Sequence, residues 1–220
     1  MAESIAVFQK TGTSHTLTAG AFYGLIAGFT CYGLIGSAVV ANAVVEAGFV
    51  PGMFAYILLG IIAPMGGIYI AQKSDSWLLS FVGYHLVLVP FGVILAPVLV
   101  IYDPNIVRDA CTLTAAITVV MGAAGIMFPQ VFSKLGGALF VSLIGLIVVR
   151  VLAIFIPALN DLGFIDYMAA GIFSLYIGYD MYRASTIERT LDNSVDVALS
   201  LYMDIINLFL SLLRIFGRKD

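Results

Sequence analysis

The stretch from Leu17 to Val45 contains no charged residue, and similar apolar runs follow it along almost the whole chain. A helix that crosses a hydrocarbon core of about 30 Å needs about 20 apolar residues, so these runs are long enough to cross. A water-soluble domain built from them would expose large apolar patches. The sequence therefore predicts an integral membrane protein, with the lipid bilayer as its first partner.

Composition narrows the fold class to helices. Of the 220 residues, 61% are hydrophobic and only 10% are charged. The apolar runs are continuous, whereas the strands of a membrane barrel alternate apolar and polar residues in segments of about ten. The formal net charge of −3 is spread over the loops, which provides no basic surface for nucleic acid. We expect an all-α membrane protein that binds no nucleic acid.

Charged residues, prolines and turn residues divide the chain into seven apolar segments. We predict that these segments are transmembrane helices of one domain that covers residues 1–220. Their approximate ranges are 17–44, 52–72, 77–101, 110–132, 135–159, 164–189 and 195–213.

The distribution of cations sets the orientation, because Lys and Arg concentrate on the cytoplasmic side of membrane proteins. The loop around Glu46 and the loop around Asp161 and Asp166 carry only acid. The N-terminus and the alternate loops carry Lys10, Lys73, Lys134, Arg183 and Arg189. We therefore predict a short cytoplasmic N-terminus, residues 1–16. Three cations after the last segment break the pattern, so the last helix either crosses against the charge rule or is re-entrant. They are Arg214, Arg218 and Lys219.

Two aspartates stand in apolar surroundings, Asp180 in SLYIGYDMYR and Asp204 in ALSLYMDIINLF. The turn residues LDNS at 191–194 separate them, and each aspartate lies twelve residues from position 192. Because helical residues rise about 1.5 Å each, a hairpin folded there brings both carboxylates to the same depth. Two carboxylates in one desolvated site cannot both ionise cheaply. The pair is thus a candidate pH sensor.

The last segment carries polar residues at intervals of three or four, the spacing that places side chains on one helix face. This stripe consists of Asp196, Ser200, Asp204, Asn207, Ser211 and Arg214. Such a face cannot be turned to lipid, so we predict that Asp196, Ser200, Asn207 and Ser211 face a pore. On the preceding segment, Arg183 shares a face with Asp180.

Arg150 is the one cation placed deep in an apolar run, in LIVVRVLAIF. An intramembrane cation is costly and normally pairs with acids in the protein interior. Counting residues from the loops puts Arg150 within about one or two helical turns of the aspartates. The alternative interpretation is that the side chain of Arg150 extends toward the outer membrane surface and pairs with no acid.

With these residues in view, the chain resembles the transmembrane Bax-inhibitor-motif family, especially its small bacterial members. The most specific stretches are FSLYIGYD and ALSLYMDIINLFLSLLRIF, and PFGVILAP, LTAAITV and LGGALFVSLIGLIV are weaker but in order. The resemblance implies seven helices with the last helix at the centre. It also implies a calcium-permeable leak that responds to pH, with Asp180 and Asp204 as sensor and gate. The expected location is a bacterial inner membrane.

One departure from the family concerns the third partner of the aspartates. Family members usually carry an Arg near the cytoplasmic end of the second helix, where this chain reads YIAQKSD. Lys73, Arg150 and Arg183 are the candidates for that role. Ionised carboxylates attract Ca²⁺, but two of them fall short of the roughly six to eight oxygens of a tight site. We therefore expect weak, transient Ca²⁺ at Asp180 and Asp204, proton binding there, and no tightly bound cofactor.

Other function classes remain open at this point. An ion-coupled transporter or a membrane regulatory scaffold fits the same features. An intramembrane aspartyl protease would also need two aspartates, but those enzymes resemble one another in a Gly-x-Gly-Asp motif, where this chain has LYMD at 201–204. We expect that the chain is not an enzyme.

Overall fold

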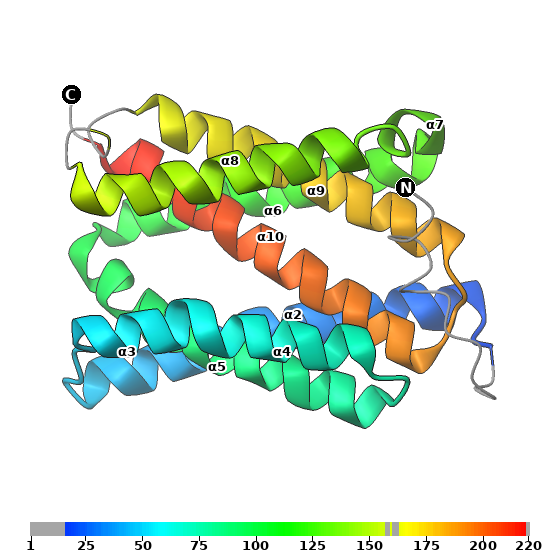
Figure 1. Cartoon of the computed structure of the whole chain (residues 1–220), viewed down its shortest axis with the longest axis horizontal. Coiled ribbons are helices and arrows are strands. Elements are labelled where there is room, and N and C mark those ends of the chain that lie inside the picture. Colours follow the sequence, from blue (N-terminus) through cyan, green and yellow to red (C-terminus); the bar gives the residue numbers. More distant parts are fainter. Residues whose placement is uncertain (1–15, 157–158, 160–162, 219–220) are drawn as a thin grey trace. The chain divides into compact units, whose positions relative to one another are not determined.

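Every regular element that the computed structural model describes is a helix (Figure 1). The described residues are 16–156, 159 and 163–218. The predicted cytoplasmic N-terminus, including Lys10, lies outside them except for Thr16, and so does Lys219. The all-α fold class is confirmed for the described part of the chain.

The helices follow the predicted apolar segments closely. Their bounds are α2 Ala19–Glu46, α3 Met53–Ile57, the π-helix η1 Leu58–Ile62, α4 Ala63–Lys73, α5 Trp77–Ile101, α6 Pro104–Met127, α7 Pro129–Phe132, α8 Gly136–Phe155, α9 Phe164–Thr186 and α10 Leu191–Gly217.

Six described helical segments are long and apolar enough to cross a membrane: Ala19–Glu46, Phe54–Lys73, Trp77–Ile101, Pro104–Met127, Gly136–Ala153 and Leu191–Gly217. The remaining predicted crossing, α9, is not among them; it contains Asp166, Asp180 and Arg183. The count of seven crossings therefore stays a prediction. Large apolar side chains are widely exposed, including Phe54 and Ile101 at 78% each, as expected of surfaces that contact lipid.

The chain forms two compact units, and α10 begins in the first and ends in the second. Unit 1 contains Met1–Ile101 and Ile187–Tyr202, and unit 2 contains Tyr102–Thr186 and Met203–Asp220. The most apolar window of α10 is 78% buried, against 11–39% in the other five candidate spans. Burial on nearly all sides explains why apolar residues surround the polar stripe of this helix. The single domain of residues 1–220 stays a prediction.

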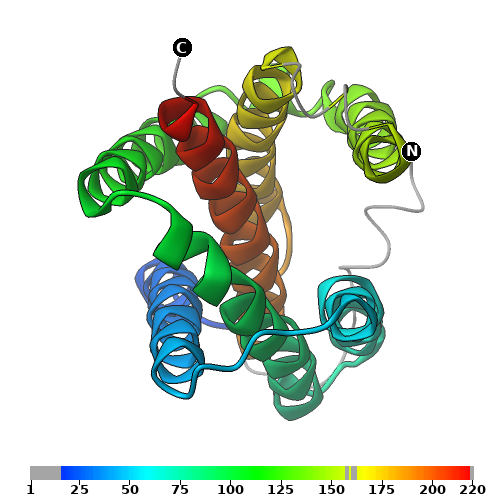
Figure 2. The ribbon, with the colours of Figure 1, turned by 90° about the vertical axis from the view of Figure 1, so that its left-hand side faces the viewer.

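In unit 1, α5 packs against both α2 and α4 (Figure 1, Figure 2). Gly67 of α4 and Gly83 of α5 lie so close that a Cβ on either would overlap the carbonyl oxygen of the other. Small residues allow this approach. At the end of α2, Gly48 has φ +62, a conformation that glycine adopts without a steric penalty.

In unit 2, α9 packs against α6 and α8. A Cβ on Gly125 of α6 would overlap the backbone of Gly178 in α9, and a Cβ on Gly178 would overlap the ring of Phe132. This contact holds α9 close to its neighbours two residues before Asp180. The glycines therefore fix the position of the helix that carries the first aspartate.

We expect Gly178→Ala to lower the melting temperature of the purified chain, because overpacking of this kind costs about 1–3 kcal/mol. Gly137→Ala in α8 is the matched control, since a Cβ there meets nothing within 4 Å. Thermal unfolding in an uncharged detergent compares the two variants. Equal melting temperatures would contradict the close packing at Gly178.

The predicted boundaries of two helices were wrong. Residues 191–194 are not a turn but the first turn of α10, because the Oγ1 atom of Thr190 accepts a hydrogen bond from the backbone N–H of Asn193 at 3.0 Å and caps the helix. The fourth predicted segment starts earlier, at Pro104, where the carboxylate of Asp103 accepts from the backbone N–H of Asn105 at 2.8 Å. Turn residues marked the first stretch as a loop and charged residues marked the second, although capping residues begin helices there.

Candidate functional site

The structure brings the carboxyl groups of Asp180 and Asp204 together within unit 2, in hydrogen-bonding contact. Asp180 is 4% exposed and Asp204 is 8% exposed, so both are removed from solvent. The bend between their helices lies before Leu191, earlier than position 192. Equal distance from the bend is therefore not what aligns the two side chains, even though they meet.

Arg183 is the cation that the structure places on this pair. Its Nη1 atom donates to Oδ1 of Asp180 at 2.9 Å, one helical turn along α9. Its guanidinium also lies over the ring of Tyr179, 5.9 Å from the ring centroid. With a side chain 23% exposed, Arg183 connects the buried carboxyl of Asp180 to the surface of unit 2.

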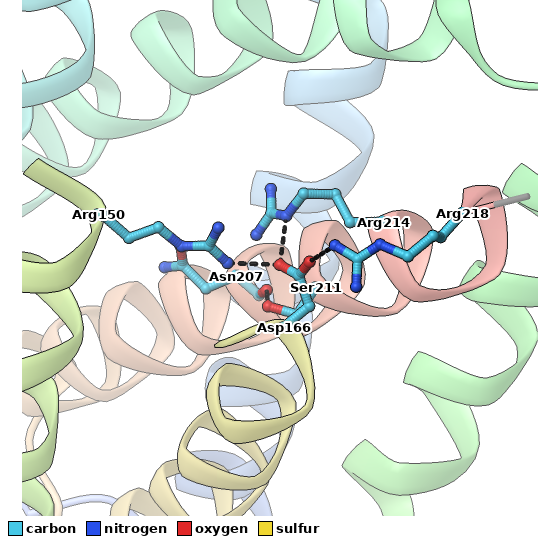
Figure 3. A network of polar contacts seen from close by, with 6 residues as sticks. All are labelled: Arg150, Asp166, Asn207, Ser211, Arg214 and Arg218. Carbon is cyan, nitrogen blue, oxygen red and sulfur yellow. Dashed lines mark hydrogen bonds and ion pairs between the residues drawn. The ribbon is translucent and has the colours of Figure 1, made fainter. Parts of the chain in front are cut away.

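Arg150 lies on a different carboxylate. Its Nη2 atom donates to Oδ1 of Asp166 at 2.5 Å, and Arg214 and Arg218 donate to the same carboxylate (Figure 3). Lys73 is the last residue of α4, in unit 1. Of the three candidate partners, only Arg183 has a described ion pair with the aspartate pair.

The polar stripe of α10 lies in buried or half-buried positions. Asp196 is 5% exposed and Ser211 is 1% exposed, while Ser200 and Asn207 are half-buried. Asn207 and Ser211 bond within their own helix: the Nδ2 atom of Asn207 donates to the carbonyl of Met203, and the hydroxyl of Ser211 donates to the carbonyl of Asn207, each at 2.8 Å. The helix thus satisfies these two groups by itself. That they face a pore stays a prediction.

The match to a family covers nearly all of the described chain. Residues 16–220 match the model of the family described as "Inhibitor of apoptosis-promoting Bax1". This chain belongs to that Bax inhibitor family. The sequence resemblance carried by the two aspartate-containing stretches is thereby confirmed.

Relatives in the Bax inhibitor family come from bacteria and from yeast. An uncharacterized membrane protein of Streptococcus pyogenes serotype M3 is 36% identical over 135 residues, which is 59% of each chain. Bax inhibitor 1 of Schizosaccharomyces pombe is 30% identical over 151 residues, 66% of this chain and 55% of its own. The inner membrane protein YbhL of Escherichia coli K12 is 26% identical over 137 residues, 58% of each chain. The matches thus span less than two thirds of these relatives.

In this member of the Bax inhibitor family, a hydrogen bond between the two carboxyl groups requires a proton. An ionised carboxylate has only hydrogen-bond acceptors, so contact between two carboxyls by a hydrogen bond needs a proton on one of them. The Oδ2 atom of Asp204 is buried and has no hydrogen-bond partner among the described residues. Two carboxyls in this arrangement can share one proton; that they act as a pH sensor stays a prediction.

The described residues do not form a dedicated metal centre. No three His, Cys, Asp or Glu side chains come together among them in a group that could hold a metal ion. Two carboxylates with Arg183 nearby carry a formal charge of −1 when both are ionised and zero when one is protonated. Two carboxylates supply fewer oxygens than the roughly six to eight of a tight Ca²⁺ site; weak, transient Ca²⁺ at Asp180 and Asp204 stays a prediction.

Sequence reasoning missed the role of Asp166, which served only as an acidic marker of an outer loop. The structure places it in the first turn of α9, 2% exposed, with three arginines on its carboxylate. A usable signal was present: an acid in the first turn of a helix is favoured by the helix dipole, and Arg150 lacked a partner. Combining the two would have suggested the pair.

Proposed function

We propose that this chain is a calcium-permeable leak channel whose opening depends on pH, with Asp180 and Asp204 as its proton-binding gate. One observation carries the proposal: two buried carboxyls in hydrogen-bonding contact, with Arg183 on one of them. The resemblance to the Bax inhibitor family supports calcium as the permeant ion. Protons and Ca²⁺ are then the site's small partners.

Protonation gives this gate two states. With one proton, the two carboxyls share a hydrogen bond that draws α9 and α10 together in unit 2. Without it, two negative charges repel each other across a poorly solvated contact, and Arg183 offsets only part of that repulsion. Loss of the proton also exposes oxygens that attract Ca²⁺. The proton and the permeant ion would therefore compete for the same atoms.

Two other functions would use the same residues in different ways. An ion-coupled transporter would use the pair to carry a proton, and a regulatory scaffold would use the membrane helices only to present a surface. An aspartyl protease is the weakest alternative, because Arg183 holds one of the aspartates in an ion pair. We favour a channel without catalytic activity, in a bacterial inner membrane with a cytoplasmic N-terminus; the E. coli relative is named an inner membrane protein.

Calcium flux through the purified chain in liposomes tests the proposal. We expect Ca²⁺ to enter protein-containing vesicles down its gradient without any second substrate, at a rate that changes with pH. Vesicles without protein are the control. Flux that requires an opposing proton gradient would favour a transporter, and the absence of flux at every pH would favour a scaffold.

A further inference from the structure

Tyr179 lies on the same face of α9 as Arg183, and its ring contacts that arginine. The Cζ atom of Arg183 is 5.9 Å from the centroid of the Tyr179 ring, inside the roughly 6 Å range of a cation–π contact. The Nη1 atom of the same guanidinium donates to Oδ1 of Asp180 at 2.9 Å. Spacings of three and four residues bring these side chains together on a helix. One conformation of Arg183 therefore makes both contacts.

The ring of Tyr179 is itself packed against α8, within unit 2. A Cβ on Gly136, the first residue of α8, would overlap the phenol end of Tyr179, so the missing side chain at Gly136 leaves room for the ring. Tyr179 is half-buried, and the centroid of the Tyr182 ring is 5.9 Å from its own. Close packing of this kind limits where the ring can lie, and it lies beside Arg183.

A support beside Arg183 matters because an arginine side chain is long and flexible. Its conformational freedom opposes an ion pair with any one carboxylate. The side chain of Arg183 is 23% exposed, so water also competes for its donors. Guanidinium planes stack on aromatic faces, and a ring on one side of the group reduces both effects. Tyr179 thus favours the conformation in which Arg183 donates to Asp180.

We propose that Tyr179, seated against Gly136, is a positioning residue that keeps Arg183 on Asp180 and so decides how readily a permeant Ca²⁺ gains that carboxylate. The inference rests on the proposed channel function, whose gate contains Asp180. Nη1 of Arg183 lies next to Oδ1 of Asp180, and two cations close to one oxygen repel each other. Ca²⁺ at this carboxylate therefore competes with the guanidinium, and a weaker hold on the guanidinium favours Ca²⁺.

The position of Arg183 is measured first, without ion flux, by NMR of the full chain in lipid nanodiscs with isotope-labelled arginine. The Arg183 signal is the one that Arg183→Gln removes. A guanidinium held by its neighbours rotates slowly about its Nε–Cζ bond. We expect Tyr179→Leu to accelerate this rotation, and Tyr179→Phe to leave it near that of the wild type, because the ring remains.

Calcium flux then measures the consequence, as the Ca²⁺ concentration that gives half-maximal entry into liposomes. One pH is used, at the alkaline end of the pH–flux profile. We expect Tyr179→Leu to lower this concentration about threefold, the effect of losing one cation–π contact at a partly exposed site. Added to Arg183→Gln, Tyr179→Leu should change little further, because it acts through Arg183. Tyr167→Leu is the control, since Tyr167 is a 62% exposed tyrosine of the same helix.

Gly136→Ala tests the same contact from α8 and leaves the sequence of α9 unchanged. Its added Cβ meets the phenol end of Tyr179, whereas the Cβ added in Gly137→Ala meets nothing within 4 Å. We expect faster rotation of the Arg183 guanidinium in Gly136→Ala and wild-type rotation in Gly137→Ala. Equal rotation in these two variants would contradict the seat at Gly136.

The two measurements separate this inference from the channel function. Unchanged rotation of Arg183 in Tyr179→Leu, or equal acceleration in Tyr179→Phe, would overturn the positioning role whatever the flux shows. Faster rotation with an unchanged Ca²⁺ requirement would overturn the competition with Ca²⁺. No Ca²⁺ flux through the wild-type chain, with faster rotation in Tyr179→Leu, would overturn the channel function instead and leave the hold of Tyr179 on Arg183 as a structural contact.

Discussion

Asp204→Asn is expected to remove most of the pH dependence of calcium flux, and Asp180→Asn is expected to do the same. The two carboxyls are in hydrogen-bonding contact and share one proton-binding function, so removing either ionisable group removes the switch. Asn keeps the size and hydrogen-bonding capacity of the side chain but cannot titrate. The measurement is Ca²⁺ entry into liposomes over a pH series.

The double variant separates a shared switch from two independent groups. Coupled residues give non-additive effects, so the double replacement should add little to either single one. Asp192→Asn is the matched control: Asp192 lies on the same helix, is equally buried at 8% exposure, and accepts a 2.7 Å hydrogen bond from Ser80. Small, additive effects of Asp180→Asn and Asp204→Asn would contradict the shared switch.

The helices were largely predictable because an apolar run must be long enough to cross the hydrocarbon core, and charged residues mark where each run ends. The errors arose where charge and turn residues fall inside a helix. Arg108 and Asp109 were assigned to a loop, yet they lie exposed in α6. Asn193 resembles a turn residue, but its Nδ2 atom donates to the carbonyl of Glu188 at 2.7 Å and supports the start of α10. Composition locates a span, whereas capping contacts set its ends.

The candidate site was predictable only in part. Spacing along the sequence pointed to Asp180 and Asp204, because two acids at membrane depth are costly unless they have partners. The choice of cation was not predictable in this way. Arg150, Arg183 and Lys73 all lay near enough by residue counting, and what separates Arg150 from the pair is its bond to Asp166. Tertiary packing, which leaves no trace in residue spacing, decides between such alternatives.

Arg183→Gln is therefore expected to move the midpoint of the pH–flux profile to higher pH by about one unit. The guanidinium bonded to Asp180 favours the ionised carboxylate; without it, ionisation costs more and the shared proton is retained to higher pH.

Arg150→Gln should shift the midpoint less, because Arg150 is bonded to Asp166, and the exposed Arg108→Gln serves as a control for the lost charge. A shift in Arg150→Gln or Lys73→Ala, with none in Arg183→Gln, would transfer the role of counter-charge to those residues. The direction also matters: a move to lower pH in Arg183→Gln would mean that Arg183 opposes ionisation, which its 2.9 Å contact with the Asp180 carboxylate argues against.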